Sequence, residues 1–152
     1  MSFLTISQSM DIDAPAGQVY GVLSDYRKGH PAILPKPYFT ELTVEEGGIG
    51  AGTVIRVGMK AMGVSSRYLM IVTEPEPGRV LVEADADAGV TTTFTVELAS
   101  GEPRCRVTIS TNMPLSRGVK GALERLVTPP VTRRIFRKQL RQLARYMAEG
   151  KA

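Results

Sequence analysis

The sequence predicts an α+β fold in which a curved antiparallel sheet of about seven strands wraps around one long C-terminal helix. The period of the apolar residues changes early in the chain from two to about 3.6 and back to two, which indicates a strand, a short helical region and further strands. The later strands are joined by short turns, so neighbouring strands are antiparallel. The last apolar segment has helical spacing and is long enough to cover one face of such a sheet.

Length and composition predict one soluble domain over residues 1–152. With 152 residues and 43% hydrophobic side chains, the chain can bury a stable core without disulfides or a structural metal. Cys105 is the single cysteine, no His/Cys cluster has zinc-binding spacing, and the N-terminal residues lack a signal-peptide pattern. We therefore expect a cytoplasmic protein with no bound metal and no membrane-spanning segment.

The first strand and the first helix are predicted from residues 4 to 26. Apolar residues that alternate with polar ones indicate a half-buried strand, and they are Leu4, Ile6, Met10 and Ile12. Val19, Leu23 and Tyr26 then recur at intervals of four and three, and Pro15 stands where a first helical turn tolerates proline. A strand is therefore followed directly by a helix.

The middle of the chain is predicted to be strands joined by tight turns. The expected strands are Thr40–Glu46, Thr53–Ala61, Val64–Glu74, Arg79–Ala86, Val90–Ala99 and Arg104–Met113. Their connections, such as GGIGAG and PEPG, are rich in glycine and proline. GGIGAG precedes a strand and no Gly-Lys-Ser/Thr follows it, so we interpret it as a turn and expect no nucleotide cofactor.

The terminal helix is predicted over Ser116–Glu149, and Thr128 with Pro129 is expected to kink or restart it. Residues 132–152 contain seven Lys or Arg and one Glu, a net +6, so the other 131 residues carry −2. A basic stripe on this helix consists of Arg133, Arg134, Arg137, Lys138 and Arg141. It is typical of a solvated face. An anionic membrane surface or an acidic partner is compatible with it, whereas the scarcity of interleaved aromatic residues argues against nucleic acid.

Two short motifs resemble the START-like (SRPBCC) superfamily, which includes polyketide cyclases, lipid-transfer domains and birch-allergen-like proteins. MDIDAPAGQVYGVLSDY is similar to the family's opening at Ile12, Ala14, Pro15, Val19, Tyr20, Leu23 and Asp25. GIGAGTVIRV resembles the family's Gly-x-Gly turn into the third strand through Gly50, Gly52 and Thr53. The resemblance covers essentially the whole order of elements and implies a helix-grip fold.

The resemblance also implies a cavity between the sheet and the long helix that binds a small hydrophobic or aromatic ligand, such as a lipid, a polyketide or a quinone-like molecule. Side chains expected to line it are Gln8, His30, Met59, Tyr68, Met70, Phe94, Met113, Leu123 and Val127. The alternative is that these side chains pack together as an ordinary core. A polyketide cyclase/dehydratase acting on such a ligand, and a partner-binding module using the basic helix, are the alternative functions.

His30 is the only histidine and lies in YRKGHPAILPKPYF, a proline-broken segment that in the family borders the cavity mouth. We interpret it first as part of a wall and gate, and second as a general base, because no Ser or Cys nucleophile motif accompanies it.

Glu83, Asp85 and Asp87 share one face of a predicted strand. We interpret that face as solvated, with a hard-cation site as the alternative and an Arg67–Glu83 cross-strand pair as a further expectation.

Overall fold

Seven antiparallel strands form one curved sheet in the computed structural model, which describes residues 2–100 and 103–150. Their order is β1-β7-β6-β5-β4-β3-β2, so the first and last strands of the chain are neighbours. The strands are β1 Phe3–Ile12, β2 Phe39–Glu46, β3 Val54–Ala61, β4 Val64–Glu76, β5 Val80–Asp85, β6 Val90–Leu98 and β7 Cys105–Pro114. The predicted sheet is confirmed.

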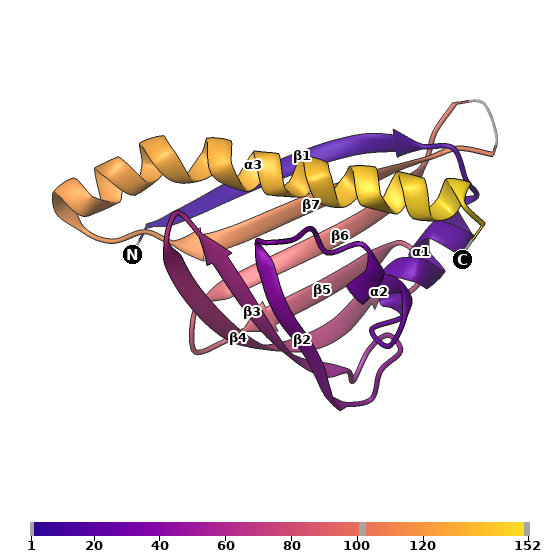
Figure 1. The fold of residues 1–152 in the computed structure, drawn as a ribbon, viewed down its shortest axis with the longest axis horizontal. Helices are drawn as coiled ribbons and strands as arrows, with labels where there is room; N and C mark the ends of the chain where they lie inside the picture. Colours follow the sequence, from indigo (N-terminus) through magenta and orange to yellow (C-terminus); the bar gives the residue numbers. More distant parts are fainter. Residues whose placement is uncertain (1, 101–102, 151–152) are drawn as a thin grey trace.

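Three helices complete the described part of the fold: α1 Ala16–Ser24, α2 Gly29–Ala32 and α3 Gly118–Ala148. Helix α3 lies across one face of the sheet, and α1 and α2 lie near its C-terminal end (Figure 1). Phe136, Leu140 and Leu143 of α3 belong to the same buried cluster as Phe94 and Ile109 of the sheet. The architecture is the predicted helix grip, with the core between sheet and helix.

Helix α3 is continuous through Pro129 and Pro130, so the expected restart at this position is wrong. The two prolines remove the backbone donors that would bond to the carbonyl groups of Arg125 and Leu126. Both of these residues are exposed, so water can solvate the carbonyl groups that the prolines leave without helical donors. Among the described residues, no helix is long and apolar enough to cross a membrane.

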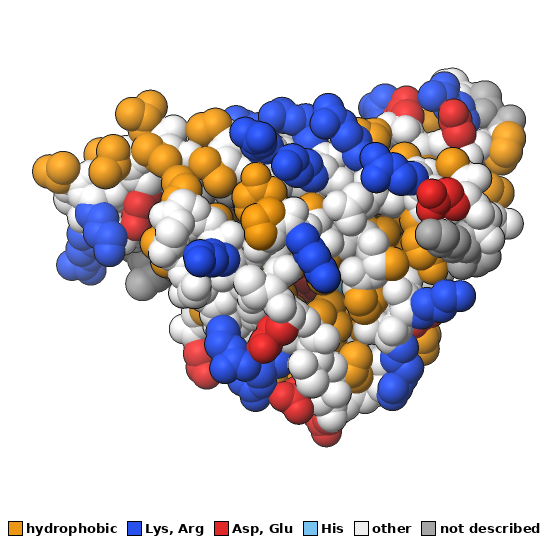
Figure 2. All heavy atoms as spheres, in the orientation of Figure 1, with side chains coloured by type: hydrophobic (Ala, Val, Ile, Leu, Met, Phe, Trp, Pro, Cys, Tyr) orange, Lys and Arg blue, Asp and Glu red, His pale blue; other side chains and the backbone are white. Residues whose placement is uncertain are grey.

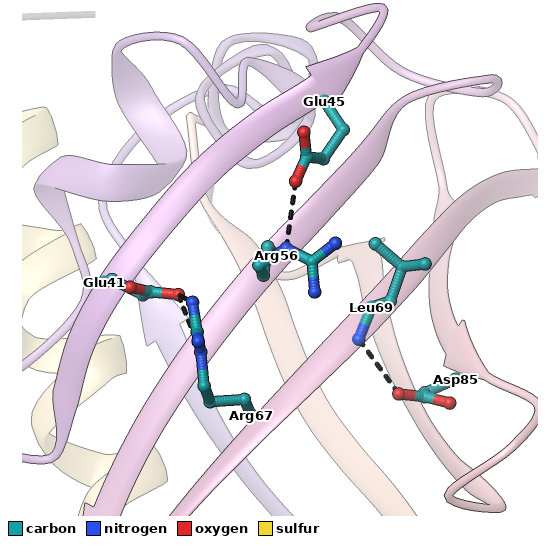
Figure 3. Close-up of polar contacts among 6 residues, drawn as sticks. All are labelled: Glu41, Glu45, Arg56, Arg67, Leu69 and Asp85. Carbon is teal, nitrogen blue, oxygen red and sulfur yellow. Dashed lines mark hydrogen bonds and ion pairs between the residues drawn. The ribbon is translucent and has the colours of Figure 1, made fainter.

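Ion pairs on the outer face of the sheet join the edge strand β2 to β3 and, across it, to β4 (Figure 3). Arg56 Nε donates to Glu45 Oε1 at 2.9 Å, and a terminal nitrogen of Arg67 donates to Glu41 Oε1 at 2.6 Å. The expected Arg67–Glu83 pair is therefore wrong. Arg67 faces outward from β4 toward Glu41, whereas Glu83 lines the interior.

Candidate ligand-binding site

A cavity of about 440 Å³ lies between the sheet and α3. Its floor is made by side chains at alternate positions of the strands, for example Ile55, Val57 and Met59 of β3. Its roof is one side of α3 and consists of Glu124, Thr128, Val131, Thr132, Ile135, Phe136 and Gln139. At 1.5 Å per residue this part of the helix runs for about 22 Å. The lining is mostly apolar, which suits an elongated hydrophobic molecule.

Six of the nine predicted ligand-binding residues line this cavity: His30, Met59, Tyr68, Met70, Phe94 and Met113. Their contact with a ligand remains a proposal. Leu123 and Val127 do not line it and are 59% and 37% exposed, because each precedes a roof residue by one position and points about 100° away around the helix. Gln8 is also outside the lining, because α3 packs directly against β1 and leaves no space over that strand.

A buried cluster of three polar side chains lies at the cavity, and two of them, His30 and Glu83, line it. The Tyr26 hydroxyl donates to Glu83 Oε2 at 2.6 Å, and His30 Nε2 lies 3.3 Å from the same oxygen. His30 Nδ1 lies 2.7 Å from the carbonyl oxygen of Leu23. The imidazole stacks on the Tyr26 ring, with centroids 4.4 Å apart, and meets the Phe94 ring edge-on at 5.3 Å. His30 is thus held in one orientation from several sides.

These contacts fix where hydrogens lie in the cluster. A carbonyl oxygen only accepts, so His30 Nδ1 carries a hydrogen and donates it to Leu23. The approach of Nε2 to Glu83 Oε2 is favourable when one proton lies between them, as imidazolium–carboxylate or as imidazole–carboxylic acid. Burial, and then the Glu83 charge, raise the pKa of Tyr26 well above 10, so its hydroxyl stays a donor. The contact between His30 Nε2 and Glu83 Oε2 therefore places a shared hydrogen beside the cavity.

The glycine-rich turn before β3 positions this cluster. The Tyr26 backbone N–H donates to the Gly48 carbonyl at 2.8 Å, and the Gly50 N–H donates to the Ser24 carbonyl at 2.9 Å. Gly50 has φ of 61°, and a Cβ there would lie 1.9 Å from Glu74 Oε1, so a side chain at this position would strain the backbone and displace the Glu74 carboxylate. The turn thereby anchors the end of α1, from which Tyr26 and His30 follow.

One expectation about this region is corrected by the structure, and one agrees with it. His30 belongs to the short helix α2, is 2% exposed and lines the cavity, so it is part of the wall as expected, whereas its role as a gate or a general base stays a prediction. Glu83 is 7% exposed and does not lie on a solvated face. Glu83 is opposite Val72 and Thr92 in the sheet, and Val72 is buried while Thr92 lines the cavity. That register was the signal that could have placed Glu83 inside.

Tyr26, Glu83 and Gln139 are functional candidates that the sequence analysis did not place at the cavity. Glu83 alternates with the buried Leu81, and Gln139 lies between the buried Phe136 and Leu140 on α3, so each interrupts an apolar pattern with a polar group. Within residues 2–100 and 103–150, no group of three or more His, Cys, Asp or Glu is arranged to hold a metal ion.

The predicted basic stripe lies on the outer side of α3. Arg133, Arg134, Arg137 and Arg141 are exposed, and Lys138 lies over the Tyr38 ring with its Nζ 5.3 Å from the centroid. Lys and Arg side chains gather along this part of the helix in Figure 2, whereas apolar side chains gather over its N-terminal part. The apolar group includes Val119, Leu123 and Leu126. Charge and apolar surface are thus separated along one helix.

Comparison with known proteins agrees with this architecture. The sequence model of the family described as "Polyketide cyclase / dehydrase and lipid transport" matches residues 4–148. No curated protein matches the chain.

Several solved structures are similar over nearly the whole chain. The solution structure of KanY protein has 26% identity and a TM-score of 0.81, covering 96% of this chain and 98% of that one. ZhuI aromatase/cyclase from Streptomyces sp. R1128 has 15% identity and a TM-score of 0.72, with 94% and 92% covered. Norcoclaurine synthase from Thalictrum flavum, in complex with a transition-state analogue, has 17% identity and a TM-score of 0.70, with 99% and 98% covered. At the lower two identities the similarity is one of fold.

Proposed function

Because the chain belongs to the polyketide cyclase / dehydrase and lipid transport family, an SRPBCC-type family whose members bind small hydrophobic ligands, we propose that its cavity binds one small hydrophobic or aromatic molecule. A lipid, a polyketide or a quinone-like compound falls within this class. The observation that carries the proposal is the 440 Å³ cavity with its mostly apolar lining. A cytoplasmic location is part of the same proposal.

Native mass spectrometry of the protein as purified, followed by solvent extraction, tests this proposal directly. We expect a bound small molecule, or saturable binding of an apolar fluorescent dye if the cavity has been emptied. Ser66 lines the cavity, whereas its neighbour Ser65 is exposed and does not line it, so the pair provides a matched control. Ser66→Trp should block binding and Ser65→Trp should leave it unchanged. Equal dye binding by both variants and by the wild type would place the ligand elsewhere and contradict the proposal.

A polyketide cyclase/dehydratase is the second candidate function, and the His30–Glu83 pair favours it. With Oε2 engaged by Tyr26 and His30, Glu83 Oε1 is available to take a proton from a carbon next to a ketone. The electron pair of that C–H bond then delocalises onto the ketone oxygen as an enolate, and the protonated His30–Glu83 pair balances its charge. The apolar walls would hold the chain folded for ring closure.

Turnover of an enolisable poly-β-ketone tests the second candidate. His30→Ala and Glu83→Gln should each lower the rate constant about a hundredfold or more and leave ligand affinity nearly unchanged. A wild type that binds the compound without turning it over would remove the enzyme candidate and leave the binding function in place. A change in association and dissociation rates alone in His30→Ala would support a gating role.

A partner-binding module remains the other alternative, and the exposed arginines of the basic stripe favour it. Its occupant would be an anionic membrane surface or an acidic protein. This alternative is compatible with a ligand in the cavity, because the stripe and the cavity lie on different sides of α3.

A further inference from the structure

Gln139 is a buried amide that the protein itself does not satisfy. Its side chain lies on the cavity side of α3 and is 3% exposed. It makes no hydrogen bond to any residue in the described part of the chain, yet its amide is not sealed inside packed core. A buried amide without a partner costs free energy, so an apolar residue would be the more stable choice here if nothing bound to it.

On the opposite wall of the cavity, Glu83 has a second polar atom without a hydrogen-bond partner. Tyr26 and His30 both engage its Oε2, whereas Oε1 has no hydrogen-bond partner among the residues that the structure describes. The other buried polar residues of the lining, His30 and Thr111, have partners, whereas the remaining polar lining residues without a partner in the described chain are only half-buried: Ser66, Tyr68, Thr128 and Thr132. Thr92 Oγ1 and Thr111 Oγ1 are 3.1 Å apart, and Glu124 accepts two hydrogen bonds from Ser116. The helix wall and the sheet wall thus each present to the same cavity one buried polar group that has an atom without a hydrogen-bond partner in the described chain.

We infer that Gln139 recognises an oxygen atom on an otherwise apolar ligand, an inference that rests on the proposed binding function. The amide nitrogen donates to a ligand carbonyl, and Glu83 Oε1 accepts from a ligand hydroxyl. The ligand class is therefore an aromatic or apolar skeleton that carries a carbonyl and a hydroxyl, such as a hydroxylated aromatic ketone or the enol of a 1,3-diketone. A plain hydrocarbon leaves both groups without partners and binds less tightly.

Two probes of nearly equal shape test the role of Gln139. In competition with an apolar dye, 2-acetylnaphthalene should bind the wild type about tenfold more tightly than 2-ethylnaphthalene, which lacks the carbonyl. Gln139→Leu should remove this difference in affinity, because it weakens the binding of 2-acetylnaphthalene and leaves that of 2-ethylnaphthalene unchanged. Gln142→Leu is the matched control, because Gln142 lies on the same helix outside the cavity lining. The Gln142→Leu variant should still bind 2-acetylnaphthalene more tightly than 2-ethylnaphthalene.

A stability measurement separates recognition from a structural role. Without ligand, Gln139→Leu should raise the melting temperature, because it removes a buried amide that lacks a partner. A lower melting temperature together with unchanged discrimination between the two probes would overturn the inference. So would equal affinity of the wild type for both probes, which would leave the proposed binding function intact. Failure of the wild type to bind either probe would overturn the binding function and this inference with it.

Discussion

Tyr26 and Glu83 are 57 positions apart in the sequence and meet through one short hydrogen bond inside the fold. The bond supplies a donor to a carboxyl group that has left water, and such bonds to charged groups are among the stronger ones in proteins. The same tyrosine stacks on His30, so its ring and its hydroxyl act on the two members of the proton-sharing pair separately.

Replacing Tyr26 with Phe keeps the stacked ring and removes only the hydroxyl. We expect the free energy of unfolding at pH 7 to fall by about 1.5–3 kcal/mol, because Glu83 Oε2 loses a buried donor. Urea unfolding of the variant and the wild type measures the change. A variant as stable as the wild type would show that the hydroxyl contributes nothing to the cluster.

The difference in the free energy of unfolding between the wild type and Tyr26→Phe should depend on pH, because the pKa of Tyr26 is raised in the folded protein. Below pH 10 the hydroxyl is protonated in the folded and unfolded states, so its contribution is complete. Above pH 10 the unfolded chain loses this proton while the folded protein keeps it, so the wild type loses stability as pH rises. The phenylalanine variant lacks this loss, and the two proteins should converge at alkaline pH. Burial raises the pKa of Tyr20 to about 12, and this residue is common to both proteins.

Residue patterns predicted which side chains point inward but not which polar groups meet. The alternation in β3 and β4 placed Met59, Tyr68 and Met70 at the cavity, because side chains in a strand point to opposite faces with a period of two. The His30–Glu83 contact depends on how α2 docks on β5, which no local pattern encodes. A single acidic residue in a strand was therefore assigned to the solvent.

At the scale of elements, α3 is tied to the chain before it by Ser116 and Glu124. The Ser116 backbone N–H donates to Glu124 Oε1 and its hydroxyl donates to Oε2, both at 2.8 Å. These two bonds lower the pKa of Glu124, the backbone bond contributing most. Glu124 also begins the cavity roof, so the same side chain anchors the helix and borders the ligand site.

Glu124→Gln should lower the melting temperature at pH 7 but have little effect at low pH. A carboxyl whose pKa is lowered in the folded state adds stability above its ordinary value of 4.5 and loses it as pH falls through the folded value. Thermal unfolding at pH 7 and near pH 3 measures both limits. Glu46→Gln, at an exposed carboxylate, is the control. An equal loss at both pH values would attribute the effect to shape and not to charge.

Helical spacing predicted the existence and length of α3 well, but not its rotation about its axis. Leu123 and Val127 were assigned inward because they are apolar, whereas the roof uses their polar neighbours Glu124 and Thr128. Toward its N-terminus the helix has an apolar exposed side, so hydrophobicity no longer indicates which side is buried. The rotation is set where Phe136 and Leu140 enter the core.

At the scale of the whole molecule, positive charge is concentrated on one side of α3 (Figure 2). If the basic stripe binds anionic lipid, the protein should bind vesicles of phosphatidylcholine with phosphatidylserine at low salt and release them steeply toward physiological salt. The double variant Arg137→Glu/Arg141→Glu should abolish binding. Co-sedimentation with vesicles at several salt concentrations measures both effects.

The control carries the same change of charge away from the stripe. Lys60 and Arg79 are exposed and lie outside α3, so Lys60→Glu/Arg79→Glu should retain most of the binding. Equal losses in the two double variants would indicate a response to net charge. No binding by the wild type even at low salt would leave the stripe as a solvated face.

The outer face of β3 and β4 forms ion pairs and the inner face lines the cavity, so the two faces can change independently during evolution. The outward side chains of Arg56 and Arg67 pair with carboxylates of β2, while the inward side chains between them shape the cavity. A mutation at Met59 or Tyr68 can therefore alter the shape of the binding space without touching the ion pairs outside. Proteins that share this sheet can therefore acquire different ligand preferences by single inward substitutions, while the ion pairs that hold the outer face of the sheet stay the same.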